Sequence, residues 1–210
     1  MSIEKFGLYL VITDPRTSYE RCAEAAVKAG LRYIQLRMKK ASRDTILHKA
    51  LSLRAITKGS QTRLIINDDP QLAVESDADG VHLGQSDMPL AEARQRFPQL
   101  SVFGLSTHSE QQAAAATTLP ELPDYCGVGP VYATPTKEIP DPELGPERAG
   151  AIINAAPFTT VAIGGINEDK LRTVLYNGAI NYSVVRYVCC SLHPFDAINR
   201  LQNIWHEFYE

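Results

Sequence analysis

Apolar strands and amphipathic helices alternate along almost the whole chain, and this alternation constrains the fold more than any other feature. Segments with the composition of buried strands lie at 8–13, 33–38, 63–66, 80–83, 101–105, the first half of 125–137, 159–163 and 180–187. Strands that are each followed by a helix predict a parallel sheet. Because doubly wound sheets usually have about five or six strands, eight such units predict a closed, compact (β/α)8 TIM barrel.

Local signals place several helix boundaries. Thr17 and Glu20 have the spacing of a capping box, and Ser42, Asp69 and Asn167 stand where three further helices open. The last helix has one apolar face, made of Phe195, Ile198, Leu201, Trp205 and Phe208. These signals support a helix after each of the strands that they follow.

Length and composition fit one barrel domain over residues 1–210. The chain is 44% hydrophobic, which is enough for a substantial core. Its formal net charge is -3 with mixed signs, so the sequence predicts neither a nucleic-acid partner nor a membrane partner. The first residues lack a signal-peptide pattern, and no segment approaches about eighteen apolar residues, so we expect a cytoplasmic protein. A homo-oligomer stays among the alternatives.

The four cysteines are Cys22, Cys126, Cys189 and Cys190, and they lack the spacing of a metal knuckle. Two adjacent cysteines are poor candidates for an ordinary disulfide. We therefore expect buried free thiols.

Polar residues and glycines follow the strands at the points where the strands end. In barrels of this type the active site lies at the C-terminal ends of the strands, so these residues should surround one cavity. They are Gln35, Arg37, Lys39 and Lys40 after the second strand, Asn67, Asp68 and Asp69 after the third, Gln85 and Asp87 after the fourth, Ser106, Thr107 and His108 after the fifth, Thr134, Thr136 and Lys137 after the sixth, and Gly164 and Gly165 after the seventh.

Two carboxylates in this set suggest a hard metal ion. Asp69 directly precedes Pro70 and is the better helix cap, which leaves Asp68 available as a ligand. Asp87 taken alone is more often a helix cap, but beside Asp68 and a group of cations it suits Mg2+, which also binds phosphate oxygens. The sequence therefore predicts a site for Mg2+ on Asp68 and Asp87.

The cations and glycines predict two anionic ligands. Arg37 shares a strand face with Gln35, and an inward-facing arginine needs an anionic partner, although charge runs such as 37–40 are more often solvated. Residues 134–137 supply two hydroxyls and an ammonium, with a surface turn as the alternative. In barrels the loop after the seventh strand often holds a phosphate on backbone N–H groups, although Gly164–Gly165 also fits a plain tight turn.

A proline-rich loop follows the sixth strand and is the main elaboration of the barrel. It contains Pro140, Pro142, Gly145 and Pro146. We expect this loop to act as a mobile lid over the cavity. His108, in contrast, is expected to neighbour a helix cap and not to serve as a base.

Six motifs stand in order along the chain: QLRMKK at 35–40, LIINDD at 64–69, GVHLGQSDMP at 80–89, GLSTHS at 104–109, GVGPVYATPTK at 127–137 and AIGGI at 162–166. Together they resemble the thiamine-phosphate synthase family over nearly the whole chain. The resemblance implies a transferase that joins 4-amino-2-methyl-5-hydroxymethylpyrimidine diphosphate to 4-methyl-5-(2-phosphoethyl)thiazole. The products would be thiamine monophosphate and pyrophosphate, and Mg2+ would be the cofactor.

The resemblance also implies roles for individual residues. The pyrimidine diphosphate would be held by Gln35, Arg37, Lys39, Asn67, Ser106 and Lys137, with Asp68 and Asp87 on Mg2+. The thiazole phosphate would be held by Thr134, Thr136, Gly165 and Val185. Arg37, Lys39 and Lys137 would be catalytic, because they would stabilise the negative charge that develops on the departing pyrophosphate.

One position departs from the family pattern. The family usually reads close to AVVSAI at the end of the eighth strand, whereas this chain reads SVVRYV at 183–188. Alternation along a strand gives Val184 and Arg186 the same facing, so Arg186 is predicted to clamp the thiazole phosphate in place of a serine. An arginine that faces solvent is the alternative.

Three other functions compete with this interpretation. A thiazole tautomerase of the same superfamily would not need Asp68 and Asp87, and Pro130 stands where that branch is expected to place a histidine. Another phosphate-binding barrel would not explain Asp68 and Asp87 together. A non-catalytic thiamine-precursor binding protein would bind the same ligands without turnover.

Overall fold

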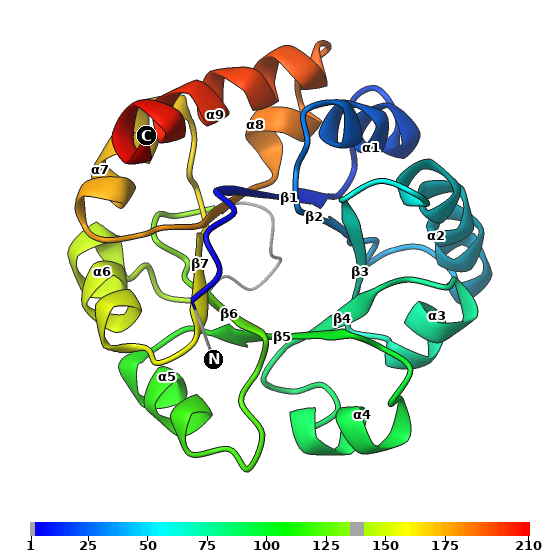
Figure 1. The fold of residues 1–210 in the computed structure, drawn as a ribbon, viewed down its shortest axis with the longest axis horizontal. Helices are drawn as coiled ribbons and strands as arrows, with labels where there is room; N and C mark the ends of the chain where they lie inside the picture. The colour runs from blue at the N-terminus through cyan, green and yellow to red at the C-terminus, as the bar shows by residue number, and fades with distance from the viewer. Residues whose placement is uncertain (1–2, 135–140) are drawn as a thin grey trace.

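Eight parallel strands close into a barrel in the computed structural model, which describes residues 3–134 and 141–210 (Figure 1). The strands are β1 (Leu8–Ile12), β2 (Tyr33–Leu36), β3 (Arg63–Asn67), β4 (Gly80–Leu83), β5 (Val102–Thr107), β6 (Tyr125–Val128), β7 (Thr159–Ile163) and β8 (Tyr182–Val184). They pair in sequence order, and β8 returns to β1 with Tyr182 opposite Leu8. The (β/α)8 barrel that the alternation predicted is confirmed.

Helices form a ring around the strands (Figure 1). They are α1 (Tyr19–Lys28), α2 (Arg43–Thr57), α3 (Pro70–Glu75), α4 (Leu90–Arg96), α5 (Glu110–Thr117), α6 (Gly145–Ala155), α7 (Glu168–Tyr176), α8 (Arg186–Cys189) and α9 (Pro194–Tyr209). Helix α9 packs against both α1 and α7, and so covers the seam where β8 meets β1. Its predicted apolar face is confirmed, because Ile198, Leu201 and Trp205 are buried and the two phenylalanines pack on the same core.

Strand residues are buried on both sides of the sheet, as a parallel barrel requires. In β1, for example, Leu8, Leu10 and Ile12 belong to the large core between strands and helices. The alternate residues Tyr9 and Val11 belong to a separate cluster inside the barrel. Period-two alternation therefore divides each strand between an outer core and an interior that leads to the cavity.

Most of the predicted helix caps are confirmed. Ser42, Asp69 and Asn167 each accept a hydrogen bond from the backbone N–H three residues later, at 2.8–3.3 Å. The capping box expected at Thr17 is wrong by one residue. Ser18 has the extended backbone of a cap, and its hydroxyl accepts from the Arg21 N–H in the first turn of α1 at 3.1 Å, so Thr17 lies outside the helix.

The predicted eighth strand is too long. It ends at Val184, and Arg186 begins the short helix α8. The cause lies in the neighbouring strand, because the last pairing of β7 with β8 joins Ile163 to Ser183. Beyond Ile163, two glycines with positive φ turn the chain away, so the end of β8 has no ladder on that side to continue.

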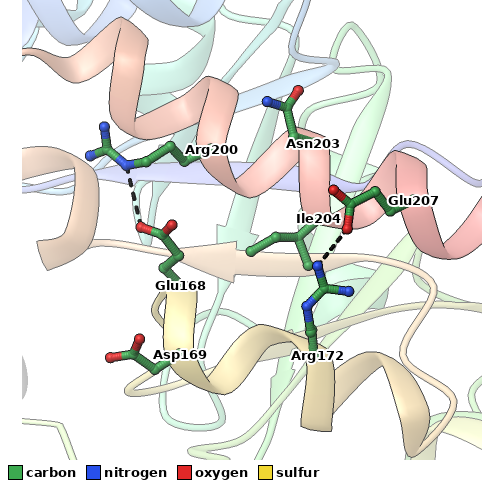
Figure 2. Close-up of a pocket in the computed structure, with 7 residues that line it drawn as sticks. All are labelled: Glu168, Asp169, Arg172, Arg200, Asn203, Ile204 and Glu207. Carbon is green, nitrogen blue, oxygen red and sulfur yellow. Dashed lines mark hydrogen bonds and ion pairs between the residues drawn. The ribbon is translucent and has the colours of Figure 1, made fainter.

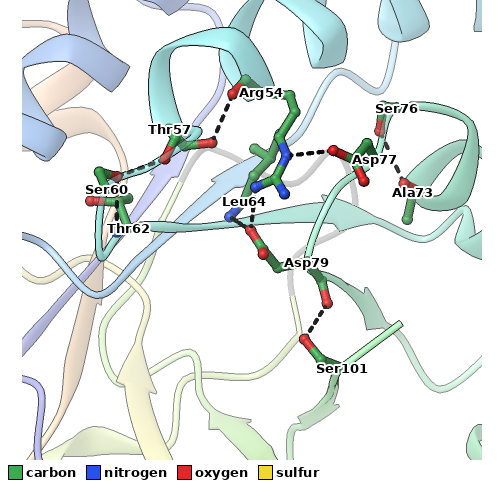
Figure 3. A network of polar contacts seen from close by, with 10 residues as sticks. All are labelled: Arg54, Thr57, Ser60, Thr62, Leu64, Ala73, Ser76, Asp77, Asp79 and Ser101. Carbon is green, nitrogen blue, oxygen red and sulfur yellow. Dashed lines mark hydrogen bonds and ion pairs between the residues drawn. The ribbon is translucent and has the colours of Figure 1, made fainter. Parts of the chain in front are cut away.

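Acidic or amide side chains directly before β4, β6 and β8 hold the N-terminal ends of neighbouring strands. Asp79 accepts from the Leu64 N–H at 2.8 Å and from Arg54 Nη1 at 3.1 Å (Figure 3). Asp124 likewise accepts from the Phe103 N–H of β5 at 2.7 Å and from Arg94 of α4 at 2.9 Å. Asn181 accepts from the two backbone N–H groups that precede β1. These bonds satisfy backbone donors at the face opposite the predicted site.

The seam between the two ends of the chain is closed by Trp205, the single tryptophan. Its Nε1 donates to the Ile180 carbonyl at 2.8 Å, and its ring covers Gly7. A Cβ atom at Gly7, where φ is +72°, would lie 3.1 Å from the indole, so glycine allows this close approach.

All four cysteines are free thiols, as predicted, and three of them are buried. Cys190 is exposed, so the expectation of burial is wrong for this residue. It follows the last residue of α8 and borders the cavity described below. None of the helices within 3–134 and 141–210 combines the length and apolar character that a membrane crossing requires.

Candidate active site

A cavity of about 800 Å³ opens at the C-terminal ends of the strands, and all eight strands or the loops that follow them contribute to its walls. Most of the residues predicted for the site line it: Gln35, Arg37, Lys39, Asn67, Asp68, Gln85, Asp87, Ser106, His108, Thr134, Gly164, Gly165, Val185 and Arg186. Lys40, Asp69 and Thr107 are not among the described lining residues. Thr136, Lys137 and Pro140 lie outside the described part of the chain, and so does the centre of the expected lid.

Two carboxylates stand together on one wall. Asp68 has a positive φ of 67°, which an aspartate tolerates, and its backbone N–H donates to the His82 carbonyl at 2.8 Å. Burial raises the pKa of Asp87, and the nearby charge of Asp68 raises it further. The side chain of Asp87 accepts from the Gly84 N–H at 2.6 Å, and α4 begins after Pro89 without a side-chain cap. The alternative that Asp87 caps this helix is therefore wrong.

The chemistry of this pair fits a hard cation. Carboxylate oxygens are the ligands that Mg2+ prefers, and a divalent charge would relieve the repulsion between Asp68 and Asp87. Across residues 3–134 and 141–210, no group of three or more His, Cys, Asp and Glu side chains could enclose a metal ion. A cation at this pair would therefore complete its coordination with water or with oxygens of a bound anion.

Cations adjoin the carboxylates on the same wall. Lys39 forms an ion pair with Asp68. Burial lowers the pKa of Arg37, while the charges of Asp68 and Asp14 oppose that shift. Two cations and two carboxylates thus lie together on this wall, which suits a ligand that combines a metal ion with a polyanion.

The floor of the cavity contains residues that the sequence interpretation missed. Tyr9, His82 and Tyr125 line the cavity together with the predicted Gln35 and Ser106. The ring of His82 stacks on Tyr125 with 5.5 Å between centroids. Alternation along β1, β4 and β6 was the signal that could have found these residues, since it points them into the barrel.

The opposite wall is built from the ends of β6 and β7. Gly164 and Gly165 have φ values of +106° and +62°, and a Cβ atom on either would lie within 2.7 Å of the chain at 130–133. The backbone of 131–132 donates to the carbonyls of Ile163 and Gly164 at 2.8 and 3.0 Å. The predicted tight turn is therefore present, and it also borders the cavity beside Thr134.

Arg186 reaches the cavity by a different route from the one predicted. The prediction relied on strand alternation with Val184, but Arg186 is the first residue of α8 and is exposed. It nevertheless lines the cavity together with Val185. The register argument is therefore wrong, and the contact of Arg186 with a thiazole phosphate stays a prediction.

His108 is held at the rim. Its Nδ1 lies 2.6 Å from the Gly129 carbonyl, which fixes Nδ1 as the protonated nitrogen. Its Nε2 lies 3.6 Å from an Asp141 oxygen, and its backbone N–H donates to Gln112. His108 thus ties the end of β5 to the chain after β6, and it adjoins the cap of α5 as expected.

A second depression, of about 500 Å³, lies between α7 and α9 (Figure 2). Ion pairs bridge its two sides: Arg200 with Glu168 at 3.3 Å, and Arg172 with Glu207. The cations and acids in these pairs neutralise each other, so this groove joins two helices and offers little charge to a ligand.

Comparison with known proteins agrees with this geometry. Residues 8–188 match the family model described as thiamine monophosphate synthase. Thiamine-phosphate synthase of Vibrio parahaemolyticus is 34% identical over 201 residues, which cover 95% of this chain and 98% of that protein. The Synechocystis relative of the same name is 37% identical over 95% of this chain, but the chain spans 57% of its length. A thiamine phosphate pyrophosphorylase from Pyrococcus furiosus superposes with a TM-score of 0.88, 29% identity and 98% coverage of both chains. The family resemblance inferred from the six motifs is thus confirmed, and the chain belongs to the thiamine-phosphate synthase family.

Proposed function

We propose that this chain joins 4-amino-2-methyl-5-hydroxymethylpyrimidine diphosphate to 4-methyl-5-(2-phosphoethyl)thiazole and releases thiamine monophosphate and pyrophosphate. The observation that carries the proposal is the wall on which Asp68 and Asp87 adjoin Arg37 and Lys39. This set matches a metal-bound diphosphate in charge and in ligand type. Membership of the thiamine-phosphate synthase family supports the same reaction.

In this proposal Asp68 and Asp87 hold Mg2+, which when bound supplies positive charge to the diphosphate oxygens. Arg37 and Lys39 bind the same diphosphate, and Lys137 is assigned to it through the family resemblance. Breaking the carbon–oxygen bond builds negative charge on the leaving group, so cations fixed beforehand stabilise the transition state more than the bound substrate. The reaction needs no nucleophilic side chain, since the thiazole nitrogen captures the pyrimidine methylene.

The pyrimidine is assigned to the floor of the cavity, where Gln35 and Ser106 lie, and Asn67, which also lines the cavity, is assigned to the same substrate. The thiazole phosphate is assigned to the opposite wall, with Thr134, Gly165, Val185 and Arg186, and with Thr136 by family resemblance. A phosphate there would meet backbone N–H groups and a guanidinium, both of which bind phosphate oxygens well. In this assignment the pyrimidine would lie on the floor, its diphosphate on the wall of Asp68 and Asp87, and the thiazole phosphate on the opposite wall of the same cavity.

A coupled assay for thiamine monophosphate tests the proposal. Purified protein with Mg2+ and both substrates should release one pyrophosphate for each thiamine monophosphate formed, and omission of either substrate should abolish both products. Binding of both ligands without product would identify a precursor-binding protein. Conversion of a thiazole tautomer without consumption of the pyrimidine diphosphate would identify a tautomerase.

A further inference from the structure

A continuous chain of side-chain hydrogen bonds crosses the floor of the cavity. Gln35 donates from Nε2 to the hydroxyl of Tyr9 at 3.0 Å, and this hydroxyl lies 2.8 Å from that of Tyr125. The Tyr125 hydroxyl lies 3.0 Å from Nδ1 of His82, whose Nε2 lies 2.8 Å from the Ser106 hydroxyl. Four hydrogen bonds thus connect Gln35 to Ser106, which are far apart in the sequence, and both of these residues border the cavity.

The middle of this chain is shielded from solvent. Tyr9 and Tyr125 are each 2% exposed and Gln35 is 4% exposed. Burial raises the pKa of Tyr9 and that of Tyr125, so both phenols stay protonated at physiological pH. Each phenol therefore has one proton to donate, and an unused donor in such surroundings would be costly.

The orientation of Gln35 fixes the direction of every other bond. Its amide nitrogen faces the phenols, since Nε2 donates to the Tyr9 hydroxyl. Tyr9 accepts from this amide and donates to Tyr125, which in turn donates to Nδ1 of His82. His82 then carries its proton on Nε2 and donates to Ser106. The carbonyl of Gln35 and the hydroxyl proton of Ser106 are the groups left for a ligand.

We infer that Tyr9, Tyr125 and His82 are positioning residues that set Gln35 as an acceptor and Ser106 as a donor, and so select an aminopyrimidine over an oxopyrimidine. An aminopyrimidine presents an amino donor and a ring-nitrogen acceptor, which complement these two groups. An oxopyrimidine presents the reverse pair. The inference rests on the proposed function, because it takes the pyrimidine as the ligand on this floor.

The two ends are coupled through the chain. For Ser106 to become an acceptor, His82 would have to move its proton to Nδ1, both phenols would have to reverse, and Gln35 would have to turn its amide. One end therefore keeps its role as long as the bonds between the ends persist. A break in the middle should free both ends at once.

Tyr125→Phe makes that break without removing the aromatic ring. Tyr33→Phe is the matched control, because Tyr33 belongs to the same aromatic cluster, 6.1 Å from Tyr125, but its hydroxyl donates to Glu4. Calorimetric titration with Mg2+ and without thiazole would measure the dissociation constants of the aminopyrimidine diphosphate and its 4-oxo analogue. We expect wild type and Tyr33→Phe to prefer the amino compound by about a hundredfold or more, and Tyr125→Phe by less than about tenfold.

Nitrogen-15 NMR of the histidine ring gives a second readout that needs no ligand. In the wild type and in Tyr33→Phe, His82 should carry its proton on Nε2, whereas Tyr125→Phe should populate both tautomers. A proton on Nδ1 in the wild type, or an unchanged preference ratio in Tyr125→Phe, would overturn the inference. If the wild type bound neither pyrimidine diphosphate, the selection and the proposed function would both fall, even with the proton found on Nε2. An intact preference for the amino compound with the wrong tautomer would instead sink the inference alone.

Discussion

Asp87 is a carboxylate in surroundings that disfavour its charge. Burial raises its pKa, Asp68 raises it further, and the Gly84 N–H and Lys39 only partly compensate. Because the folded protein binds this proton more tightly than the unfolded chain, the contribution of Asp87 to stability is present at low pH. It is lost as the pH rises through the folded-state pKa. Near neutral pH the metal-free protein therefore bears an electrostatic cost at this residue.

Asp87→Asn should accordingly separate stability from activity. An asparagine oxygen can still accept from the Gly84 N–H, while the like-charge repulsion with Asp68 disappears. In metal-free buffer at neutral pH, urea unfolding should show equal or higher stability than wild type, and the difference should shrink as the pH falls. Formation of thiamine monophosphate with Mg2+ should drop by about a hundredfold or more. If Asp87→Asn formed thiamine monophosphate at the wild-type rate, the assignment of Asp87 as a metal ligand would be wrong.

Substitution of Arg186 tests whether this residue binds the thiazole phosphate. Arg186→Ala should raise the KM for thiazole phosphate by roughly tenfold or more, the loss expected for a charge-assisted hydrogen bond of about 1.5 to 3 kcal/mol. The KM for the pyrimidine diphosphate should stay nearly constant. Arg172→Ala is the matched control, since Arg172 pairs with Glu207 in the groove between α7 and α9. Equal KM values for Arg186→Ala and wild type would mean that this guanidinium faces solvent.

Among the elements, several strands are held at their N-terminal ends, on the face opposite the candidate site, by the same kind of hydrogen bond. Asp79, Asp124 and Asn181 each precede an even-numbered strand and bond to backbone N–H groups of a neighbouring strand or of the segment before β1. Arginines from the outer helices meet the two aspartates, through Arg54 and Arg94. These bonds connect strands to outer helices at the end of the barrel opposite the candidate site.

Asp79→Asn should therefore lower the free energy of unfolding by about 1 to 2 kcal/mol, because the oxygen that accepts from both the Leu64 N–H and Arg54 would lose the negative charge that strengthens these two bonds. Asp77→Asn is the control. Asp77 also contacts Arg54, at 3.2 Å, but its side chain is 71% exposed, and its φ of +55° suits asparagine. Asp77→Asn should lower the free energy of unfolding by less than about 0.5 kcal/mol. Urea denaturation measures both, and equal losses would contradict the role assigned to Asp79.

The elements could largely be predicted from the sequence, because each strand is a short apolar run and most helices carry a cap signal. The misses have physical causes. Strand β8 ends early because its partner β7 turns away at Gly164, which a local pattern does not contain. In the site, residues after the strands were found by their polarity. Tyr9 and Tyr125 were missed because, within a strand, an inward-facing tyrosine has the same pattern as a core residue.

At the scale of the whole molecule, closure of the barrel makes one probe report on both ends of the chain. Trp205 lies on α9, bonds to the carbonyl of Ile180 and covers Gly7, so its environment depends on the seam between β8 and β1. We expect tryptophan emission and far-ultraviolet circular dichroism to give one urea midpoint, since a strand of a closed barrel is lost only with both its ladders. An earlier emission change would mean that the seam opens before the rest.

The pairing of Leu8 with Tyr182 also imposes an order on biosynthesis. Of the eight strands, β1 leaves the ribosome before the others and can meet β2 soon afterwards, but its other edge stays open until β8 has been translated. Open strand edges recruit strands from other chains. We therefore expect a chain that stalls before Tyr182, with this edge of β1 unpaired, to aggregate more readily than a chain in which β8 has been translated.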